Sequence, residues 1–257
     1  MKQTSILAKA SRSLASATVM VIGLGLAGLA VAALAAPPAA AGEMESSYAR
    51  GGKLYDKWYK VIDDSAPKTA HPLYPSDKKY AEKPKSNWRC KECHGWDYQG
   101  VDGAYASGSH STGIKGVAGM TGADPAEVVA ILKGAGHGYG DKLSDRDMTD
   151  LANFITAGLT DMDAYIDRDT KMPKGGDAAR GAAYYNTVCA GCHAKDGTLP
   201  KDMGKSLGAQ MGNPWEVMHK IVNGQPDEKM PALRAFGMQP VVDIMAYIAT
   251  LPSKKLK

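Results

Sequence analysis

All four cysteines of this 257-residue chain stand in two copies of one short pattern, Cys-x-x-Cys-His. The residues of the two copies are Cys90, Cys93 and His94, and Cys189, Cys192 and His193. Thiols three positions apart lie about one helical turn from each other, so both can add to vinyl groups of one porphyrin. The following imidazole is then presented to the iron from the same side. The pattern is the attachment signature of c-type haem and predicts two covalently bound haem c groups with their iron.

Three other uses of paired cysteines fit less well. A zinc site built from two Cys-x-x-Cys pairs usually separates them by about 15–20 residues, whereas 95 residues lie between Cys93 and Cys189. A thioredoxin-like redox pair needs a βαβ context, and no stretch shows the alternation of a strand. Ordinary disulfides would leave the histidine that follows each pair unexplained.

The two halves resemble each other beyond these motifs. Three further pairs of segments match in the same order: 49–55 with 179–185, 124–128 with 213–217, and 150–155 with 243–248. Self-similarity of this kind identifies repeated structural units. The chain therefore arose by tandem duplication, and each half is expected to fold alike.

The repeated segments predict three short helices in each half. The first helices are expected at 47–60 and 177–188, and the middle helices run to about Lys133 and Val222. Asp124 and Asn213 are the expected N-caps of the middle helices, each followed by Pro and completed by Glu as a capping box. The last helices begin near Ser144 and Gln239. The fold class expected is all-α.

The halves differ in one place. Tyr185 precedes Cys189 by four residues, but Tyr55 precedes Cys90 by thirty-five. The first half thus carries a 31-residue insertion at about 56–88. Such long loops are often functional. Two interpretations are open: the insertion covers an apolar edge, or it is a docking or substrate element.

A resemblance to a known family extends these inferences. Gly181–Tyr185, Cys189–His193, Met230-Pro231 and Ala246–Ile248 resemble a class I cytochrome c domain. The chain over about 47–252 is similar in plan to the dihaem cytochrome c4 group. The resemblance implies two tandem class I cytochrome c domains, at 42–168 and 169–257, each with three short helices wrapped around one covalent haem. The first half departs from the family in its insertion and in its sixth iron ligand.

In that family a methionine in the loop before the last helix supplies the sixth ligand. The resemblance implies this role for Met230, and Pro231 after it matches the usual pairing. The alternatives are Met211, Met238 and Met245. Met238 and Met245 fall at or inside the last helix, where core packing is the ordinary role of methionine.

The first half has no methionine at the corresponding place. Met230 precedes Tyr247 by seventeen residues, and His137 precedes the matching Phe154 by the same number. We therefore expect His137 to be the sixth ligand of the first haem, which would make that iron bis-histidine coordinated. The residues that remain open as alternatives are Met120, Met148, His71 and His110.

Different axial ligands predict different reduction potentials. A methionine sulfur favours ferrous iron and raises the potential relative to imidazole. The first haem should therefore have the lower potential, so that electrons enter there and leave from the second.

The N-terminus predicts export. Lys2, Lys9 and Arg12 precede an apolar run from about Leu14 to Ala36, and a small-residue segment ends near Ala41. This is the pattern of an export signal over 1–41, which places the mature protein in the periplasm. The run is also long enough for an uncleaved membrane anchor. We expect membrane attachment only if this segment is not cleaved.

Charge limits the partners. Cleavage at Ala41 removes three basic and no acidic residues, so the formal net charge falls from +4 to +1. A nucleic-acid partner would want a clustered basic face, and none is expected.

These features favour an electron carrier over an enzyme. We expect redox partner proteins, a donor and an acceptor whose identities stay open. One alternative is a dihaem oxidoreductase with a catalytic first haem, similar to thiosulfate dehydrogenases or peroxidases. A cysteine ligand of the thiosulfate dehydrogenase kind is not available, because attachment consumes all four cysteines. The other alternative is the cytochrome subunit of a larger oxidoreductase.

Overall fold

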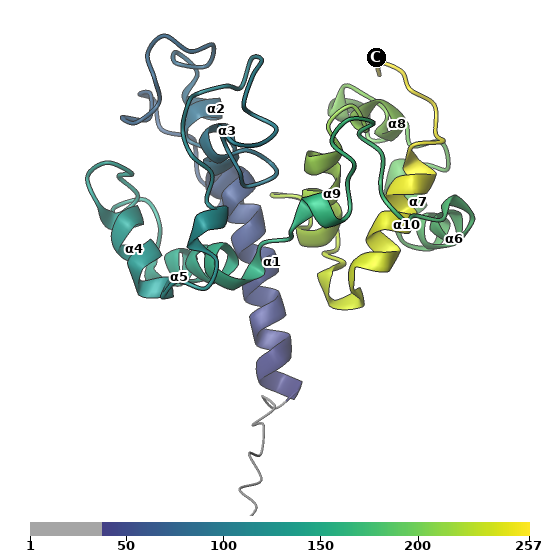
Figure 1. Cartoon of the computed structure of the whole chain (residues 1–257), viewed down its shortest axis with the longest axis horizontal. Helices are drawn as coiled ribbons and strands as arrows, with labels where there is room; N and C mark the ends of the chain where they lie inside the picture. The colour runs from purple at the N-terminus through teal and green to yellow at the C-terminus, as the bar shows by residue number, and fades with distance from the viewer. Residues whose placement is uncertain (1–37) are drawn as a thin grey trace, which may run out of the picture. The chain divides into compact units, whose positions relative to one another are not determined.

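Helices joined by turns build the chain in a computed structural model, which describes residues 38–257 (Figure 1). No strand occurs in this range, where only three isolated bridges pair extended residues. The prediction of an all-α fold is confirmed for it. The expected export segment lies outside the described residues except for 38–41. In the described range, no helix is both long and apolar enough to span a membrane.

The three helices predicted for each half occur in order, but two further short helices stand between the first and the middle one in each half. Those of the first half are α1 (Pro38–Val61), α2 (Pro84–Asn87), α3 (Cys90–His94), α4 (Pro125–Lys133) and α5 (Asp145–Asn153), which a π-helical turn, Phe154–Gly158, continues. Those of the second half are α6 (Ala178–Tyr184), extended by the π-helical turn Tyr185–Cys189, then α7 (Ala190–His193), α8 (Leu207–Gln210), α9 (Pro214–Asn223) and α10 (Met238–Ile248). Helix α1 begins earlier than expected, is kinked at Lys57 and enters the insertion.

Apart from α1, the helices begin near the residues that the sequence predicts, but the capping boxes expected at Asp124 and Asn213 do not form. Asp124 caps α4 by accepting the Ala126 N–H at 2.9 Å, and Ser144 forms a capping box with Asp147 at the start of α5. The prediction that the Asn213 side chain caps α9 is wrong. Its amide donates to Glu216 at 3.1 Å instead of accepting a main-chain N–H, and Pro214 alone marks the start of α9.

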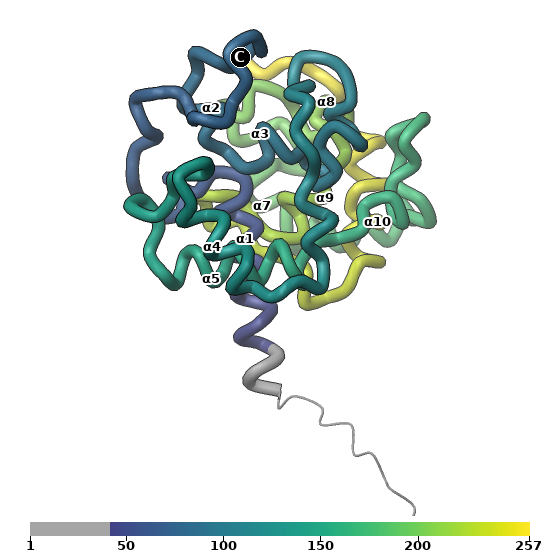
Figure 2. The backbone as a smooth tube through the Cα atoms, turned by 60° about the vertical axis from the view of Figure 1, so that its left-hand side comes forward, coloured from purple at the N-terminus to yellow at the C-terminus, as the bar shows by residue number. Residues whose placement is uncertain are grey.

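The first and last helices of each half cross at a glycine. A Cβ at Gly51 would collide with the Asp150 carbonyl oxygen, and a Cβ at Gly181 would collide with that of Asp243. A close approach of this kind admits only glycine. The matched sequence segments therefore make the matched contact in both halves, α1 with α5 and α6 with α10. Figures 1 and 2 show α5 beside α1.

A salt bridge repeats at the same crossing. Arg50 binds Asp150 at 2.8 Å in the first half, and Arg180 binds Asp243 at 2.9 Å in the second. In each half the arginine precedes the crossing glycine, and the aspartate carries the carbonyl that the glycine approaches. The close helix crossing and its salt bridge therefore both occur in each half.

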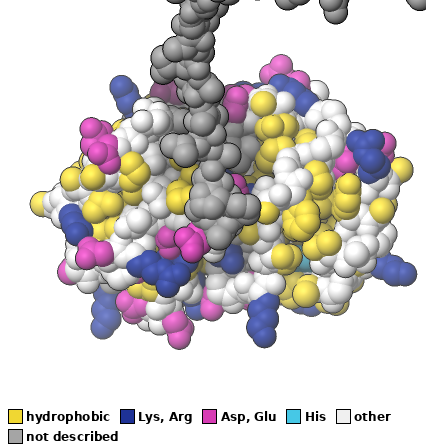
Figure 3. Space-filling model, turned by 90° about the horizontal axis from the view of Figure 1, so that it is seen from below, with side chains coloured by type: hydrophobic (Ala, Val, Ile, Leu, Met, Phe, Trp, Pro, Cys, Tyr) yellow, Lys and Arg dark blue, Asp and Glu magenta, His cyan; other side chains and the backbone are white. Residues whose placement is uncertain are grey.

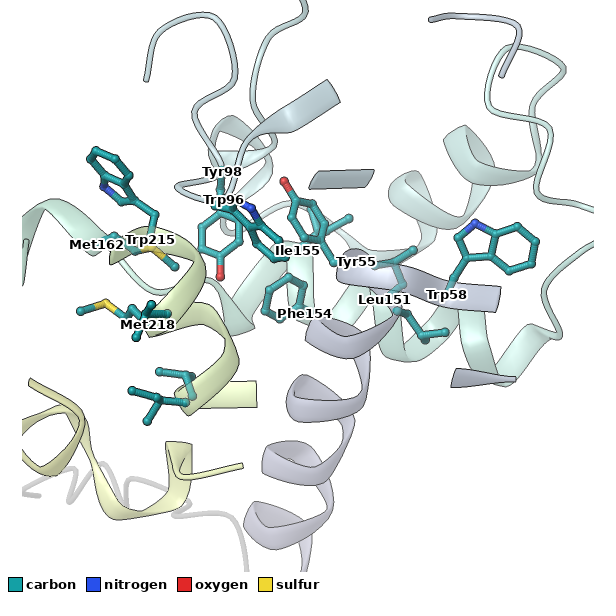
Figure 4. Close-up of a cluster of buried hydrophobic side chains, with 14 of the residues drawn as sticks. Tyr55, Trp58, Trp96, Tyr98, Leu151, Phe154, Ile155, Met162, Trp215 and Met218 are labelled. Carbon is teal, nitrogen blue, oxygen red and sulfur yellow. The ribbon is translucent and has the colours of Figure 1, made fainter. Parts of the chain in front are cut away.

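Residues of both halves share one hydrophobic core. His219 of α9 is fully buried and packs on Trp96 with ring centroids 5.0 Å apart. Its Nδ1 accepts the Tyr98 hydroxyl at 2.7 Å, and its Nε2–H donates to the Gly52 carbonyl at 2.9 Å. Burial lowers the pKa of His219 to about 4, which keeps the ring neutral, as that bonding requires. Figure 4 shows Trp96 and Tyr98 in the same cluster as Met218 of α9.

The surface is mixed in charge on the face that Figure 3 shows. Acidic and basic side chains alternate there, with hydrophobic side chains between them.

Candidate haem sites

Helices α3 and α7 each carry one Cys-x-x-Cys-His motif. All four cysteines are free thiols, so the disulfide alternative is not what the structure contains. Among the described residues, no three His, Cys, Asp or Glu side chains gather as metal ligands, so the zinc alternative has no ligand set there. The thiols are therefore free to form thioether bonds.

The residue that follows each motif has a left-handed backbone. Gly95 has φ +80° and Ala194 has φ +59°. The carbonyl of each accepts a hydrogen bond of 2.7 Å from a tyrosine hydroxyl, Tyr55 in the first half and Tyr185 in the second. These are the two tyrosines that the repeat aligns. Each one fixes the end of its motif helix to the first helix of its half.

The two motif histidines are oriented in the same way. The Nδ1–H of His94 donates to the Lys115 carbonyl at 2.6 Å, and that of His193 donates to the Leu199 carbonyl at 3.0 Å. A carbonyl bonded to one ring nitrogen fixes the tautomer and leaves the other for a metal. In both halves Nε2 is thus left to ligate iron.

His137 faces His94. Their ring centroids lie 6.4 Å apart and their planes are inclined by only 13°. A metal–imidazole bond is about 2 Å and a ring nitrogen lies roughly 1.1 Å from its ring centre, so imidazoles on opposite sides of one metal have centroids about 6.3 Å apart. The separation fits one iron between the two rings. Burial lowers the pKa of both histidines, which favours the neutral form that binds metal.

The other candidates in the first half are engaged elsewhere. His71 uses both ring nitrogens: Nε2–H donates to the His137 carbonyl at 3.1 Å, and Nδ1 accepts the Leu73 N–H at 3.2 Å. His110 stacks between Tyr80 and Tyr105 and binds Glu92 at 2.7 Å. Met148 is buried in the core, and Met120 packs partly buried against it.

In the second half, Met230 lies in the predicted loop between α9 and α10. It is half-buried and packs against the core. Among the alternatives, Met245 is fully buried in α10 and Met211 is nearly so. Met245 therefore has the packing role that the sequence suggested, and Met238 packs partly buried against the same core. Ligation by Met230 stays a prediction.

The two motifs differ in exposure. Cys93 is 8 % exposed, whereas Cys192 is exposed. Tyr74 and Ala81 of the insertion pack against Cys93, and burial raises the pKa of this thiol to about 12. Part of the insertion thus packs over the first motif.

Side-chain hydrogen bonds help to hold the insertion in place. The indole N–H groups of Trp58 and Trp88 donate to the carbonyls of Trp88 and Thr69, each at 2.8 Å. The side chain of Asn87 donates to the Tyr80 and Ala81 carbonyls and accepts the His71 main-chain N–H. These roles were missed from the sequence. The aromatic residues clustered at the two ends of the insertion were the one available signal.

Buried charges also surround the first motif. Asp56, fully buried, binds Arg89 and, at 2.9 Å, Lys220 of α9. Burial alone would raise the pKa of Asp56, but the positive charges of Lys220 and Arg89 outweigh it and lower the pKa. This cluster ties the chain before the first motif to the second half. Nothing in the sequence pattern indicated it.

One unpaired donor also fits a haem. The Trp215 indole N–H is buried and has no hydrogen-bond partner among the described residues. The Arg168 guanidinium lies 5.9 Å from the centre of its ring. A haem carries two propionate carboxylates, which accept hydrogen bonds and attract cations. Free paired thiols, oriented imidazoles and this donor together suit a covalent haem.

A comparison with known families concerns the second half. Residues 176–248 match the family model of subunit III of cbb3-type cytochrome c oxidase, a stretch that includes α6 to α10, the second motif and Met230. The match supports a c-type cytochrome domain over residues 176–248. Such a domain implies covalently bound haem c with its iron and a role in haem-based electron transfer. No curated protein matches the chain.

Proposed function

We propose that the chain is a periplasmic dihaem electron carrier in which electrons pass from a bis-histidine haem to a histidine–methionine haem. His94 and His137 would be the axial ligands of the first iron, and His193 and Met230 those of the second. When bound, each haem supplies a one-electron ferric/ferrous couple. The observation that carries the proposal is the near-parallel pair His94–His137 at 6.4 Å.

Two haems, rather than one, are supported by the repeated contacts. The first half has the same glycine crossing, the same arginine–aspartate bridge and the same tyrosine-to-carbonyl bond as the half that matches a cytochrome c domain. We therefore assign both halves as class I cytochrome c domains, at 42–168 and 169–257. The plan is that of a cytochrome c4-like dihaem protein.

The direction of transfer follows from the ligands. Two imidazoles give a lower potential than imidazole with thioether sulfur, so electrons run downhill from the first haem to the second. Redox proteins would serve as donor and acceptor. The export pattern of residues 1–41 puts this exchange in the periplasm.

Replacement of His137 by alanine tests the proposal. The variant should keep two haems per chain but lose the low-spin signature of one bis-histidine haem in electron paramagnetic resonance. The matched control is His110→Ala, which removes another histidine of the same half. An unchanged spectrum in His137→Ala, or a single haem in the unsubstituted protein, would contradict the assignment. N-terminal sequencing of the periplasmic fraction checks cleavage near Ala41.

A second candidate is a cytochrome subunit of a larger oxidoreductase. The match of residues 176–248 to a subunit of an oxidase favours it. Co-purification of a stable partner at native expression would support this function over a free carrier.

A further inference from the structure

We propose that His71, in the insertion, is a positioning residue that holds His137 at the first haem, so that the insertion locks the sixth ligand in place. This inference rests on the proposed role of His137 as a ligand. It assigns the insertion a function in the first site, beyond covering it.

His71 is built into its place from several sides. Its side chain is 6 % exposed, and its ring meets that of Trp88 edge-on at 4.5 Å between centroids. The Leu73 N–H binds its Nδ1, and Asn87 binds its main-chain N–H at 3.1 Å. The ring is thereby fixed with Nε2–H directed at the His137 carbonyl, 3.1 Å away.

The segment that receives this bond is rich in glycine and is closed by main-chain hydrogen bonds, from the Gly138 N–H to the Gly134 carbonyl at 2.8 Å and from the Tyr139 N–H to the Leu132 carbonyl at 3.0 Å. His137 stands in Gly-Ala-Gly-His-Gly-Tyr-Gly, residues 134–140, and Gly138 has φ +64°. Glycine-rich segments lose the most conformational freedom on ordering, so the loop needs outside contacts to stay in one arrangement. In the described part of the chain, His71 makes the one side-chain hydrogen bond recorded to residues 134–138. Removing that bond should release the ligand loop.

The neighbouring Tyr139 is held by the same cluster. Its hydroxyl donates to the Trp88 carbonyl at 3.1 Å, and its ring lies 5.9 Å from that of His71. His137 is thus fastened by its own carbonyl and by the residue two positions later. Trp88, at the end of the insertion, supports both contacts, because its ring packs on His71 and its carbonyl accepts the Tyr139 hydroxyl.

Two amide variants of His71 separate the bond from the packing. In His71→Gln the side-chain amide nitrogen reaches the position of Nε2 and can still donate to the His137 carbonyl. In His71→Asn the shorter amide can replace only Nδ1, so the donor to His137 is lost. His110→Phe, which changes a histidine with no recorded contact to the loop, is the control.

The readouts are carbon monoxide binding to the fully reduced holoprotein and hydrogen exchange of the Gly138 and Tyr139 amides. Carbon monoxide binds ferrous haem only where the sixth ligand leaves. A net hydrogen bond is worth about 1 kcal/mol, so His71→Asn should raise both the rate of binding at the first haem and the amide exchange roughly fivefold. His71→Gln and His110→Phe should stay within about twofold of the unsubstituted protein.

Each other outcome has a definite meaning. Unchanged rates in His71→Asn, or equal increases in His71→Asn and His71→Gln, would overturn the positioning role. If His71→Asn does not load the first haem, hydrogen exchange in the unsubstituted protein tests the positioning role instead. A loop that is held in place should exchange its Gly138 and Tyr139 amides as slowly as the amides of α4, and faster exchange would overturn the role. An unchanged spectrum in His137→Ala would instead overturn the ligand assignment itself, which keeps the two failures apart.

Discussion

The two Cys-x-x-Cys-His segments have matching supports but different surroundings. In each, a tyrosine hydroxyl ends the motif helix, a carbonyl orients the histidine, and a glycine lets the first and last helices cross. Only the first is covered by an insertion, which packs on Cys93 and bonds the His137 carbonyl, whereas Cys192 of the second is exposed. Histidine orientation is thus a property of the repeated scaffold. The cover differs between the halves, and so does the sixth ligand that we propose for each.

The largest expected effect is the loss of one haem at a time. Replacing both cysteines of one motif with serine, Cys90 with Cys93 or Cys189 with Cys192, should lower the haem content from two per chain to one, because in the proposed arrangement each pair forms both thioether bonds of its own haem. The pyridine haemochrome assay and intact mass measure this. Loss of both haems from either double variant would break the comparison between two independent sites.

Exchanging the sixth ligand should make the halves more alike. His137→Met should raise the potential of the first haem by on the order of 100 mV, since axial ligation spans about 0.8 V across haem proteins. Met230→His should lower that of the second. Spectroelectrochemistry of each variant reports the shift. A potential that does not move in His137→Met would remove His137 from the iron.

The buried cluster of Asp56, Arg89 and Lys220 should contribute to the free energy of unfolding. Asp56→Asn leaves Arg89 and Lys220 without their buried carboxylate and should cost about 3 kcal/mol in the free energy of unfolding. The measurement is guanidinium unfolding followed by circular dichroism.

The difference in stability between the unsubstituted protein and Asp56→Asn should depend on pH. The pKa of Asp56 is lower in the folded chain than in the unfolded chain, so its contribution is complete above the unfolded pKa of about 3.9 and is lost as pH falls towards the folded value. The gap in stability between the unsubstituted protein and Asp56→Asn should therefore shrink from pH 5 to pH 2. A constant gap would mean that the charge of Asp56 does not stabilise the fold.

The smallest effect tests the symmetry of the scaffold. Gly51→Ala and Gly181→Ala should each lower the free energy of unfolding by about 1–3 kcal/mol, because a methyl group at either crossing forces the helices apart. Gly119→Ala is the control, since a Cβ there meets nothing within 4 Å. Similar losses of stability in Gly51→Ala and Gly181→Ala would support the equivalence of the two crossings. A loss in only one of them would contradict it.

The repeated scaffold was largely predictable, because local sequence encodes it. Asp124 and Ser144 begin helices where capping chemistry places them, and the aligned Tyr55 and Tyr185 make equivalent bonds. Asn213 shows the limit of this reasoning, since Glu216 competes for its side chain.

The cover of the first site was not predictable in the same way. Its hydrogen bonds join residues far apart in the chain, such as His71 and His137, and follow no helical or strand period. The partnership of Asp56 with Lys220 joins residues 164 positions apart. Contacts of this kind depend on how distant segments of the chain pack, which a single sequence does not display.

An optical redox titration of the haem-loaded protein tests the central claim most directly, with the methionine–iron charge-transfer band followed at each potential. The account predicts two well-separated steps, with that band belonging only to the step at higher potential. Two overlapping steps at high potential, with a band of double strength, would show methionine on both irons and would contradict the assignment of His137.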